Sequence, residues 1–266
     1  MNRLLPTNAA LQLLRYLSQQ LGQLEYDAEK HRLLLPHEAG DATLYFRLPL
    51  TIASPVQGKF AMQQPVNYII LLIQSGNCAL GYFENGRNLN HKVFRSYMVR
   101  KKQGKSQVKY LKTKGKSRAG SRVRLGETLE FFENINGRLQ EYFEHHTIDR
   151  IAISCSKTLL PYLYSSKTET PFTKSDPRLL KIPRHVHTPI YEVLLDTNRY
   201  LLRGELVFDE QGRERATQLL EAAGITGLQH TPEEDSDSWE EDQEDESADE
   251  DVFYDEEDEE EDEMEW

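Results

Sequence analysis

Apolar residues near the start of the chain recur with a roughly helical spacing, at Leu11, Leu13, Leu14, Tyr16 and Leu17. The pattern predicts a helix that Asn8 caps and that ends near residues 21–22. Two strand-like stretches follow at residues 31–35 and 43–52, and the second alternates apolar with polar side chains. One helix and two strands are therefore expected before residue 53.

A run of apolar, partly β-branched residues at 68–74 predicts a fully buried strand. Ser75-Gly76-Asn77 predicts a turn into a second strand at residues 78–84, and Asn85-Gly86 is a strong hairpin signal. Residues 89–99 then return as a third strand. This meander delivers the chain to the rim of a sheet at Val99.

Residues 122–146 predict a long helix, because apolar side chains repeat every three or four positions at Leu125, Leu129, Phe132, Ile135, Leu139 and Phe143. Residues 150–154 predict a strand and residues 157–164 a short helix. Thr188 and Pro189 are typical of a cap and a first turn, so a helix is expected through residue 195. A last helix at 214–223 should stop at Gly224. The whole pattern predicts an α/β fold: a mixed sheet, mostly one layer, with flanking helices.

Charge divides the chain into a basic body and an acidic tail. The net charge is −12, but residues 232–266 hold 23 Asp or Glu and no Lys or Arg. The preceding 231 residues hold 21 acids against 32 bases, a net charge of +11. Dense like charge with few apolar residues predicts a disordered acidic tail at 231–266. We expect residues 1–60 to form an N-terminal helix and strands packed on the body, and residues 61–230 to form the main domain.

Two cysteines, Cys78 and Cys155, lie in apolar runs, and we expect buried free thiols rather than a disulfide. The first residues lack the continuous apolar core and the cleavage site of a signal peptide, and the longest apolar run, residues 68–73, is too short to cross a membrane. We therefore expect a cytoplasmic monomer that binds no membrane.

One stretch, Arg100 to Arg124, which we call the basic segment, holds eleven bases, three glycines and no acid. Such a density of positive charge favours a grip on a phosphate backbone over an ordinary solvated surface run. The predicted RNA-binding residues are Arg100, Lys101, Lys102, Lys105, Lys109, Lys112, Lys114, Lys116, Arg118, Arg122 and Arg124.

The tetrad Gly104-Lys105-Ser106-Gln107 lies inside this segment. Glycine permits backbone angles closed to other residues, so the chain can bend tightly and approach a substrate. A glutamine amide and a free backbone N–H can position a water and stabilise a developing oxyanion, although glutamine is a poor general base. From the residues alone, an ordinary polar side chain in a basic loop is the competing interpretation of Gln107.

Several motifs occur in a fixed order around this tetrad. They are HKVFRSY at 91–97, VRKKQGKSQ at 99–107, KSRAGS at 116–121, SDPRL at 175–179, Ile182-Pro183 and Thr188-Pro189. On these residues the chain, over about 68–195, resembles the release-factor-like catalytic domain of the Vms/Ankzf family, the peptidyl-tRNA hydrolases of ribosome-associated quality control.

The resemblance implies a fold like the central domain of the eukaryotic class I release factor, with residues 61–230 as the catalytic domain. It implies that Gln107 is the catalytic glutamine, that Gly104 is its enabling glycine, and that the partners are peptidyl-tRNA and the rRNA of the large ribosomal subunit. No cofactor is implied. The bond that is cut is either the peptidyl ester or a phosphodiester near the tRNA 3′ end.

The chain departs from the family in ways that concern recruitment. It holds no Cys/His zinc finger, ankyrin pair, coiled coil or unfoldase-binding segment, and Lys105 and Ser106 stand between Gly104 and Gln107 where release factors have Gly-Gly-Gln. These departures are compatible with a compact, bacterial version of the family.

Competing interpretations stay open at three places. A non-catalytic RNA-binding or ribosome-binding adaptor, with the acidic tail recruiting a basic protein, would show the same basic segment. The tail's Trp239, Phe253, Tyr254, Met264 and Trp266 are docking anchors, or the tail only repels itself and solubilises the chain. His145-His146 and the pair His185 and His187 suggest a metal, but too few ligands lie together for a zinc site. Asp176-Pro177-Arg178 is expected to be a structural turn.

Overall fold

The structure is a computed structural model that describes residues 1–20, 24–35, 44–56, 58–62, 64–96 and 116–225, with only the backbone described for 116–125. All of these residues belong to one compact unit, Met1–His230. The predicted mixed α/β class with flanking helices is confirmed. The strands divide into two five-stranded sheets, however, where the sequence predicted mostly one layer. The acidic tail lies outside the described residues.

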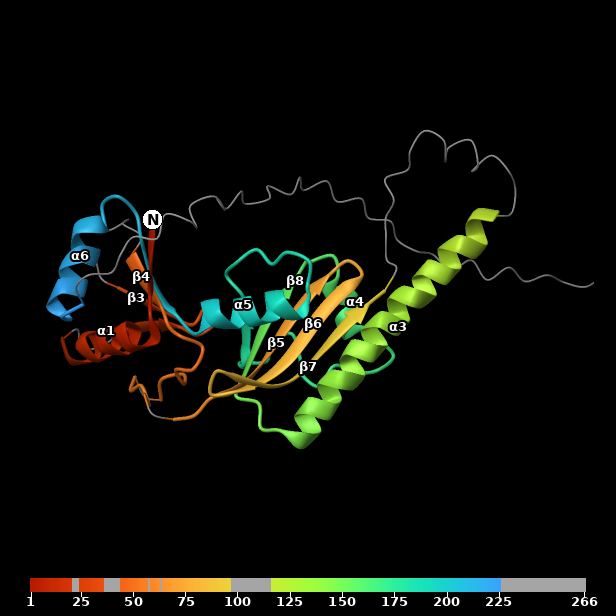
Figure 1. Ribbon diagram of the computed structural model, residues 1–266, viewed down its shortest axis with the longest axis horizontal. Helices are drawn as coiled ribbons and strands as arrows, with labels where there is room; N and C mark the ends of the chain where they lie inside the picture. The colour runs from red at the N-terminus through yellow and green to blue at the C-terminus, as the bar shows by residue number, and fades with distance from the viewer. Residues whose placement is uncertain (21–23, 36–43, 57, 63, 97–115, 226–266) are drawn as a thin grey trace, which may run out of the picture. The chain divides into compact units, whose positions relative to one another are not determined.

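The second sheet carries the predicted meander and has the strand order β7-β6-β5-β8-β9 (Figure 1). Its strands are β5 (Asn67–Gln74), β6 (Asn77–Glu84), β7 (Arg87–Arg95), β8 (Arg150–Cys155) and β9 (Leu179–Lys181). Neighbours are antiparallel from β7 to β5 and parallel from β5 to β9. The four longer strands were predicted, whereas the three-residue β9 is too short to produce a sequence pattern.

Strand β5 is buried on both faces, as its unbroken apolar run predicts. Because side chains alternate along a strand, Ile69 and Leu71 pack against α3 (Lys116–His145) and α4 (Leu160–Tyr164). Ile70 and Leu72 pack on the opposite face against α5 (Tyr191–Leu201). The sheet therefore separates two apolar cores, one under α3 and one under α5.

The hairpin between β6 and β7 has the turn that its residues predict. Asn85 and Gly86 have φ angles of 47° and 90°, and positive φ at both central positions is the mark of a type I′ turn. On the same strand, a Cβ at Gly81 would lie 2.8 Å from Leu194 Cδ2, so glycine is what lets α5 approach β6 closely.

The first sheet, of order β1-β10-β4-β3-β2, joins the two ends of the unit. Its antiparallel strands are β1 (Asn2–Leu5), β10 (Gly204–Phe208), β4 (Leu44–Arg47), β3 (Arg32–Leu34) and β2 (Glu25–Asp27). Helices α1 (Thr7–Gln20) and α6 (Arg213–Ala222) cover its core. The predicted elements α1, β3, β4 and α6 are present, and α6 is followed by Gly224 at a φ of 72°. The prediction that Asn8 caps α1 is wrong, because the helix begins at Thr7 and Asn8 lies inside it. Strand β4 is shorter than the predicted 43–52 and ends at Arg47.

The boundaries of α3, α4 and α5 differ from the prediction. Helix α3 begins six residues earlier, at Lys116, and α4 begins at Leu160 rather than at residue 157. Thr188 does not cap α5, since the N-cap is Ile190, which makes no side-chain hydrogen bond, and the helix continues to Leu201. The reason is that residues 182–190 are not helical: the Gln74 side chain donates to the Val186 carbonyl and holds this stretch across the end of the sheet.

Both cysteines are free thiols, as predicted. Cys78 is buried in β6 and Cys155 is partly buried at the end of β8. Burial raises the pKa of the Cys155 thiol to about 12 and that of Cys78 well above its usual value, so neither is an activated nucleophile. Among the described helices, none combines the length and the apolar character that a membrane span requires.

A buried ion pair ties the first sheet to α5. Arg47 Nε of β4 donates to Glu205 Oε2 of β10 at 2.8 Å, and the Tyr200 hydroxyl donates to the same oxygen at 2.7 Å. Asn2 Nδ2 donates to the other carboxylate oxygen at 2.9 Å, and the Arg47 guanidinium lies 4.5 Å from the centre of the Tyr200 ring. The Glu205 carboxylate is thus satisfied by elements far apart in the sequence, whereas Nη2 of the Arg47 guanidinium is buried without a hydrogen-bond partner among the described residues.

A second polar cluster joins the first sheet to β8. Arg150 Nη2 donates to the Ile52 carbonyl at 2.8 Å, and the buried His31 ring lies between Tyr26 and Pro49. Because a carbonyl only accepts, Nε2 of His31 donates to Pro49 O at 3.1 Å, and in a neutral ring Nδ1 then accepts from the Tyr26 hydroxyl at 2.7 Å. This arrangement fits a neutral ring, which the burial of His31 also favours by lowering its pKa.

Acid should destabilise the fold through His31. Burial, with the nearby charges of Arg150 and Arg47, holds the pKa of His31 well below 6.5. Below pH 6.5 the His31 side chain is protonated in the unfolded chain but not in the folded chain. The free energy of unfolding therefore decreases as the pH is lowered, by up to about 1.4 kcal/mol per pH unit. Urea unfolding between about pH 7 and pH 5 measures this slope. His31→Asn, which tolerates the φ of 48°, should flatten it, and the exposed His145→Asn should not; equal slopes in all three proteins would contradict the assignment.

Candidate functional site

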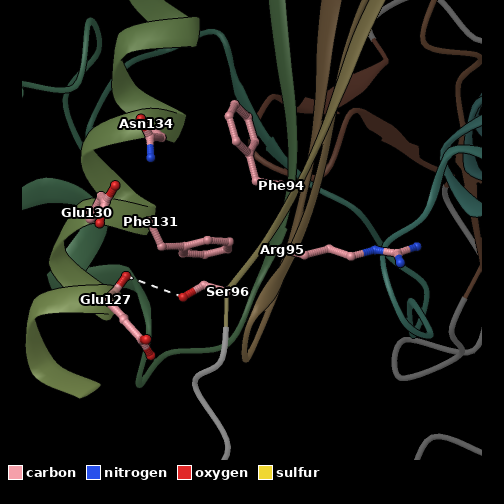
Figure 2. A pocket seen from close by; sticks show the side chains of 7 residues that line it. All are labelled: Phe94, Arg95, Ser96, Glu127, Glu130, Phe131 and Asn134. Carbon is pink, nitrogen blue, oxygen red and sulfur yellow. Dashed lines mark hydrogen bonds between the residues drawn. The ribbon is translucent and has the colours of Figure 1, made fainter. Parts of the chain in front are cut away.

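The basic segment leaves the second sheet at the end of β7 and returns to it as α3. Ser96 fixes the point of departure, which we call the root: its N–H donates to the Gly76 carbonyl at 2.8 Å, and its Oγ donates to the Glu127 carbonyl at 3.3 Å (Figure 2). The first bond fastens the root to the β5–β6 turn and the second fastens it to α3. Ser96 is therefore held to both the sheet and α3.

A hollow of about 290 Å³ lies beside the root, between β7 and α3, lined by Phe94, Arg95, Ser96, Glu127, Glu130, Phe131 and Asn134. Figure 2 shows the rings of Phe94 and Phe131 in the space between strand and helix, with Glu127, Glu130 and Asn134 along α3. Arg95 points to the opposite side of the sheet from α3. The hollow thus combines an apolar floor with an acidic rim.

The sequence did not single out this hollow. Glu127, Glu130, Phe131 and Asn134 do lie at helical spacings of three, four and seven, which predicts a shared face. The element that this face meets is fixed only by the packing of α3 against β7, which no local pattern reveals.

The predicted catalytic residues Gln107 and Gly104 lie outside the described residues, as do Arg100, Lys101, Lys102, Lys105, Lys109, Lys112 and Lys114. The remaining predicted RNA-binding residues, Lys116, Arg118, Arg122 and Arg124, belong to the first turns of α3, where the backbone alone is described. Four of the eleven bases are therefore in a helix. For Lys116 and Arg118 this differs from the prediction, which started the helix at residue 122.

Helix α3 changes charge along its length. Its first turn holds no acid and its first nine residues hold four bases. Basic groups in a first turn oppose the helix dipole, at roughly 0.3–1 kcal/mol each, and an anion at that end relieves the conflict. From Glu127 onward, Glu127, Glu130 and Glu133 make the helix acidic. A phosphate backbone is thus compatible with the start of α3 and not with its middle.

The other residues that the sequence singled out have structural roles. Asp176 and Arg178 form an ion pair at 2.8 Å, and the Arg178 N–H donates to Asp176 Oδ1 at 2.9 Å, so the predicted turn is confirmed. The hydrogen bonds and charge of Arg178 lower the pKa of Asp176. His145 Nδ1 bonds the Glu141 carbonyl, and the His146 ring stacks on Tyr82 at 4.0 Å.

His185 and His187 lie with their ring centres 5.2 Å apart. Within the part of the chain that the structure describes, no group of three or more His, Cys, Asp or Glu side chains could hold a metal ion. Both rings are exposed and belong to the stretch that crosses the end of the second sheet.

Comparison with known proteins matches residues 68–207 to the family described as "bVLRF1: Bacteroidetes VLRF1 release factor". The matched stretch begins in β5, includes the basic segment and ends in β10. Among solved structures, the chain is similar to one titled "Vms1 mitochondrial localization core", with 15% identity and a TM-score of 0.34 over 52% of this chain and 56% of that one. The chain thus spans little more than half of that structure's length. No curated protein matches the sequence.

Proposed function

The chain belongs to the Bacteroidetes VLRF1 release factor family, and from this premise we propose that it is a ribosome-associated hydrolase that separates stalled nascent peptides from tRNA. The observation that carries the proposal is the basic segment, which lies inside the matched residues and holds eleven bases with no acid. Its attachment between β7 and α3, through Ser96, supports a role as a reaching element on a fixed base.

The reaction that we propose is ester hydrolysis by the tetrad Gly104-Lys105-Ser106-Gln107. Water attacks the carbonyl carbon of the peptidyl ester, the bond from that carbon to the tRNA 3′ oxygen breaks, and the products are a peptide acid and a free 3′ hydroxyl. Gly104 allows the backbone to approach the ester, and Gln107 positions the water and stabilises the oxyanion. Since glutamine is a poor base, the proton passes to a group of the RNA.

The bases of the segment supply binding. Phosphate contacts release condensed counterions, so the logarithm of the affinity for RNA falls linearly with the logarithm of the salt concentration. The start of α3, which is basic where the helix dipole is positive, favours an anion at the same place. A salt dependence near zero would remove the RNA grip from the proposal.

The test uses stalled ribosome–nascent-chain complexes incubated with the full chain, after which both the peptide and the tRNA 3′ end are examined. Released peptide with an intact 3′ end supports ester hydrolysis. Released peptide with a shortened 3′ end identifies the target as a tRNA phosphodiester. Binding to the ribosome without release favours the competing function, a non-catalytic adaptor whose acidic tail recruits a basic protein.

The acidic tail supports a further prediction about RNA selectivity. Its 23 acids complement the +11 body, so we expect the tail to compete with RNA for the basic segment. Truncation after Thr231 should raise the affinity for random-sequence RNA several-fold at low salt, as measured by fluorescence anisotropy. Unchanged affinity would assign the tail to solubility or to partner recruitment.

A further inference from the structure

The strands of the second sheet are polarised. Strand β6 is antiparallel to both β5 and β7, and β8 and β9 are parallel to β5. Four of the five strands, β5, β7, β8 and β9, therefore run in one direction and end at the same side of the sheet, which we call the carboxyl edge. The root of the basic segment, Ser96, directly follows β7 and lies at this edge.

Hydrogen bonds place two other segments at the carboxyl edge, and strand order places a third. Ser96 N–H bonds Gly76 of the β5–β6 turn, and the Gln74 side chain at the end of β5 bonds the Val186 carbonyl. Gln74 pairs with Asn77, and Asn77 pairs with Arg95. Since neighbouring strands lie about 4.8 Å apart, roughly 10 Å separates Arg95 from Gln74. Residues 156–158 follow directly after β8, which pairs with β5 on the side opposite β6, so they lie at the same edge.

The two edges of the second sheet differ in charge. The segments at the carboxyl edge, residues 74–77, 95–96, 155–158 and 181–188, hold no acid. Their exposed side chains include Arg95, Lys157, Lys181, His185 and His187. The opposite edge carries the acids Glu84, Asp149 and Asp176, at or next to the ends of β6, β8 and β9. The same edge also carries Arg87, Arg150 and Arg178, so its charges are balanced, whereas the segments at the carboxyl edge carry bases alone.

Most of the bases at this edge are not neutralised by ion pairs with described residues. Arg184 is engaged, because it pairs with Asp196 of α5 at 3.0 Å. Arg95, Lys157 and Lys181, in contrast, form no ion pair with any residue that the structure describes. Arg95 also points away from α3 and its acids, as Figure 2 shows. Unneutralised bases on one edge are typical of a surface that meets phosphates.

We propose that the carboxyl edge of the second sheet, where Ser96 lies, is a second RNA-binding surface that takes a single-stranded RNA. Arg95, Lys157 and Lys181 bind its phosphates, and the exposed rings of His185 and His187 stack on its unpaired bases. The inference rests on the proposed function, because the strand that crosses this edge is part of the RNA that the basic segment grips.

The experiment measures the affinity of the full chain for a fluorescein-labelled oligouridine RNA over a salt series. The edge variant is Arg95→Ala/Lys157→Ala/Lys181→Ala. Its matched control is Lys30→Ala/Lys59→Ala/Arg87→Ala, which removes three exposed bases elsewhere, Arg87 being at the other end of β7. Each lost phosphate contact lowers the salt slope by about 0.7 for a single strand, so we expect a decrease of about 2 for the edge variant and none for the control.

A third variant, Lys109→Ala/Lys112→Ala/Lys114→Ala, separates the inference from the proposed function. If this variant loses affinity while the edge variant behaves like its control, the edge does not bind RNA and the proposed function stands. If none of the variants differs from the wild type, or the wild type binds no RNA, both fail. A salt slope that is lowered in the edge variant but not in its control supports the second surface. His185→Ala/His187→Ala should then weaken binding to oligouridine as well.

Discussion

Replacing Gln107 by alanine is expected to slow nascent-chain release by about 100-fold to 1000-fold while leaving ribosome binding intact. The range is the loss that follows the removal of one well-placed oxyanion donor or water-positioning group. Binding should persist because the eleven bases of the segment are unchanged. The measurement is the single-turnover rate of release from stalled complexes, with ribosome co-sedimentation as the binding assay.

Gln103→Ala is the matched control, since it removes the same side chain from the same segment one residue before Gly104. Its release rate should stay within a few-fold of the wild type. Equal release by the wild type and Gln107→Ala would remove Gln107 from the mechanism. Equal loss in both variants would point to the shape of the segment rather than to the chemistry of one amide.

The largest loss of stability is expected for Glu205→Ala, at about 3–5 kcal/mol of unfolding free energy, because it leaves the buried Arg47 guanidinium without its counter-charge. Arg47 and Glu205 have side chains only 6% and 9% exposed, and the carboxylate also accepts from Tyr200 and Asn2. Urea unfolding at neutral pH measures the loss. Asp196→Ala, which breaks ion pairs whose acid is 49% exposed, should cost less than about 1 kcal/mol.

A double variant, Arg47→Met/Glu205→Leu, tests whether the cost comes from an orphaned charge. Apolar side chains of similar size should recover much of the stability that Glu205→Ala loses. Acid provides an independent check. Burial raises the pKa of Glu205. The charge and hydrogen bond of Arg47, with the hydrogen bonds of Tyr200 and Asn2, lower it by more, so the pKa is below 4.5. The stabilisation is present above pH 4.5 and disappears as the pH falls through the folded pKa; a double variant as unstable as Glu205→Ala would contradict this account.

The sequence predicts those elements whose buried side chains form a pattern within the element itself. Strand β5 is an unbroken apolar run, and α3 repeats apolar side chains every three or four positions. Strand β10 was missed because its five residues carry no pattern of their own. Its identity as a strand depends on β1 and β4, which pair with it from the other end of the chain.

The candidate site divides in the same way. The basic segment is visible as composition, and so are the tetrad with Gly104 and Gln107. The hollow beside Ser96 and the basic carboxyl edge are not visible, because they arise when strand order brings Arg95, Lys157 and His185 to one side of a sheet. The sequence suggests only a metal for His185, whereas strand order places it at the same edge of the sheet as Arg95.

The closure of the first sheet by β10 has a consequence for synthesis. Asn2 pairs with Val207 and Leu44 pairs with Phe208, so β1 has no neighbour in the sheet, and β4 has an open side, until residue 208 has left the ribosome. Unpaired strand edges invite wrong partners, and contacts this distant in the chain form slowly. During translation the first sheet therefore stays incomplete until residues 204–208 have been synthesised. A factor that we propose to act on arrested nascent chains is itself vulnerable if its translation arrests anywhere before Phe208.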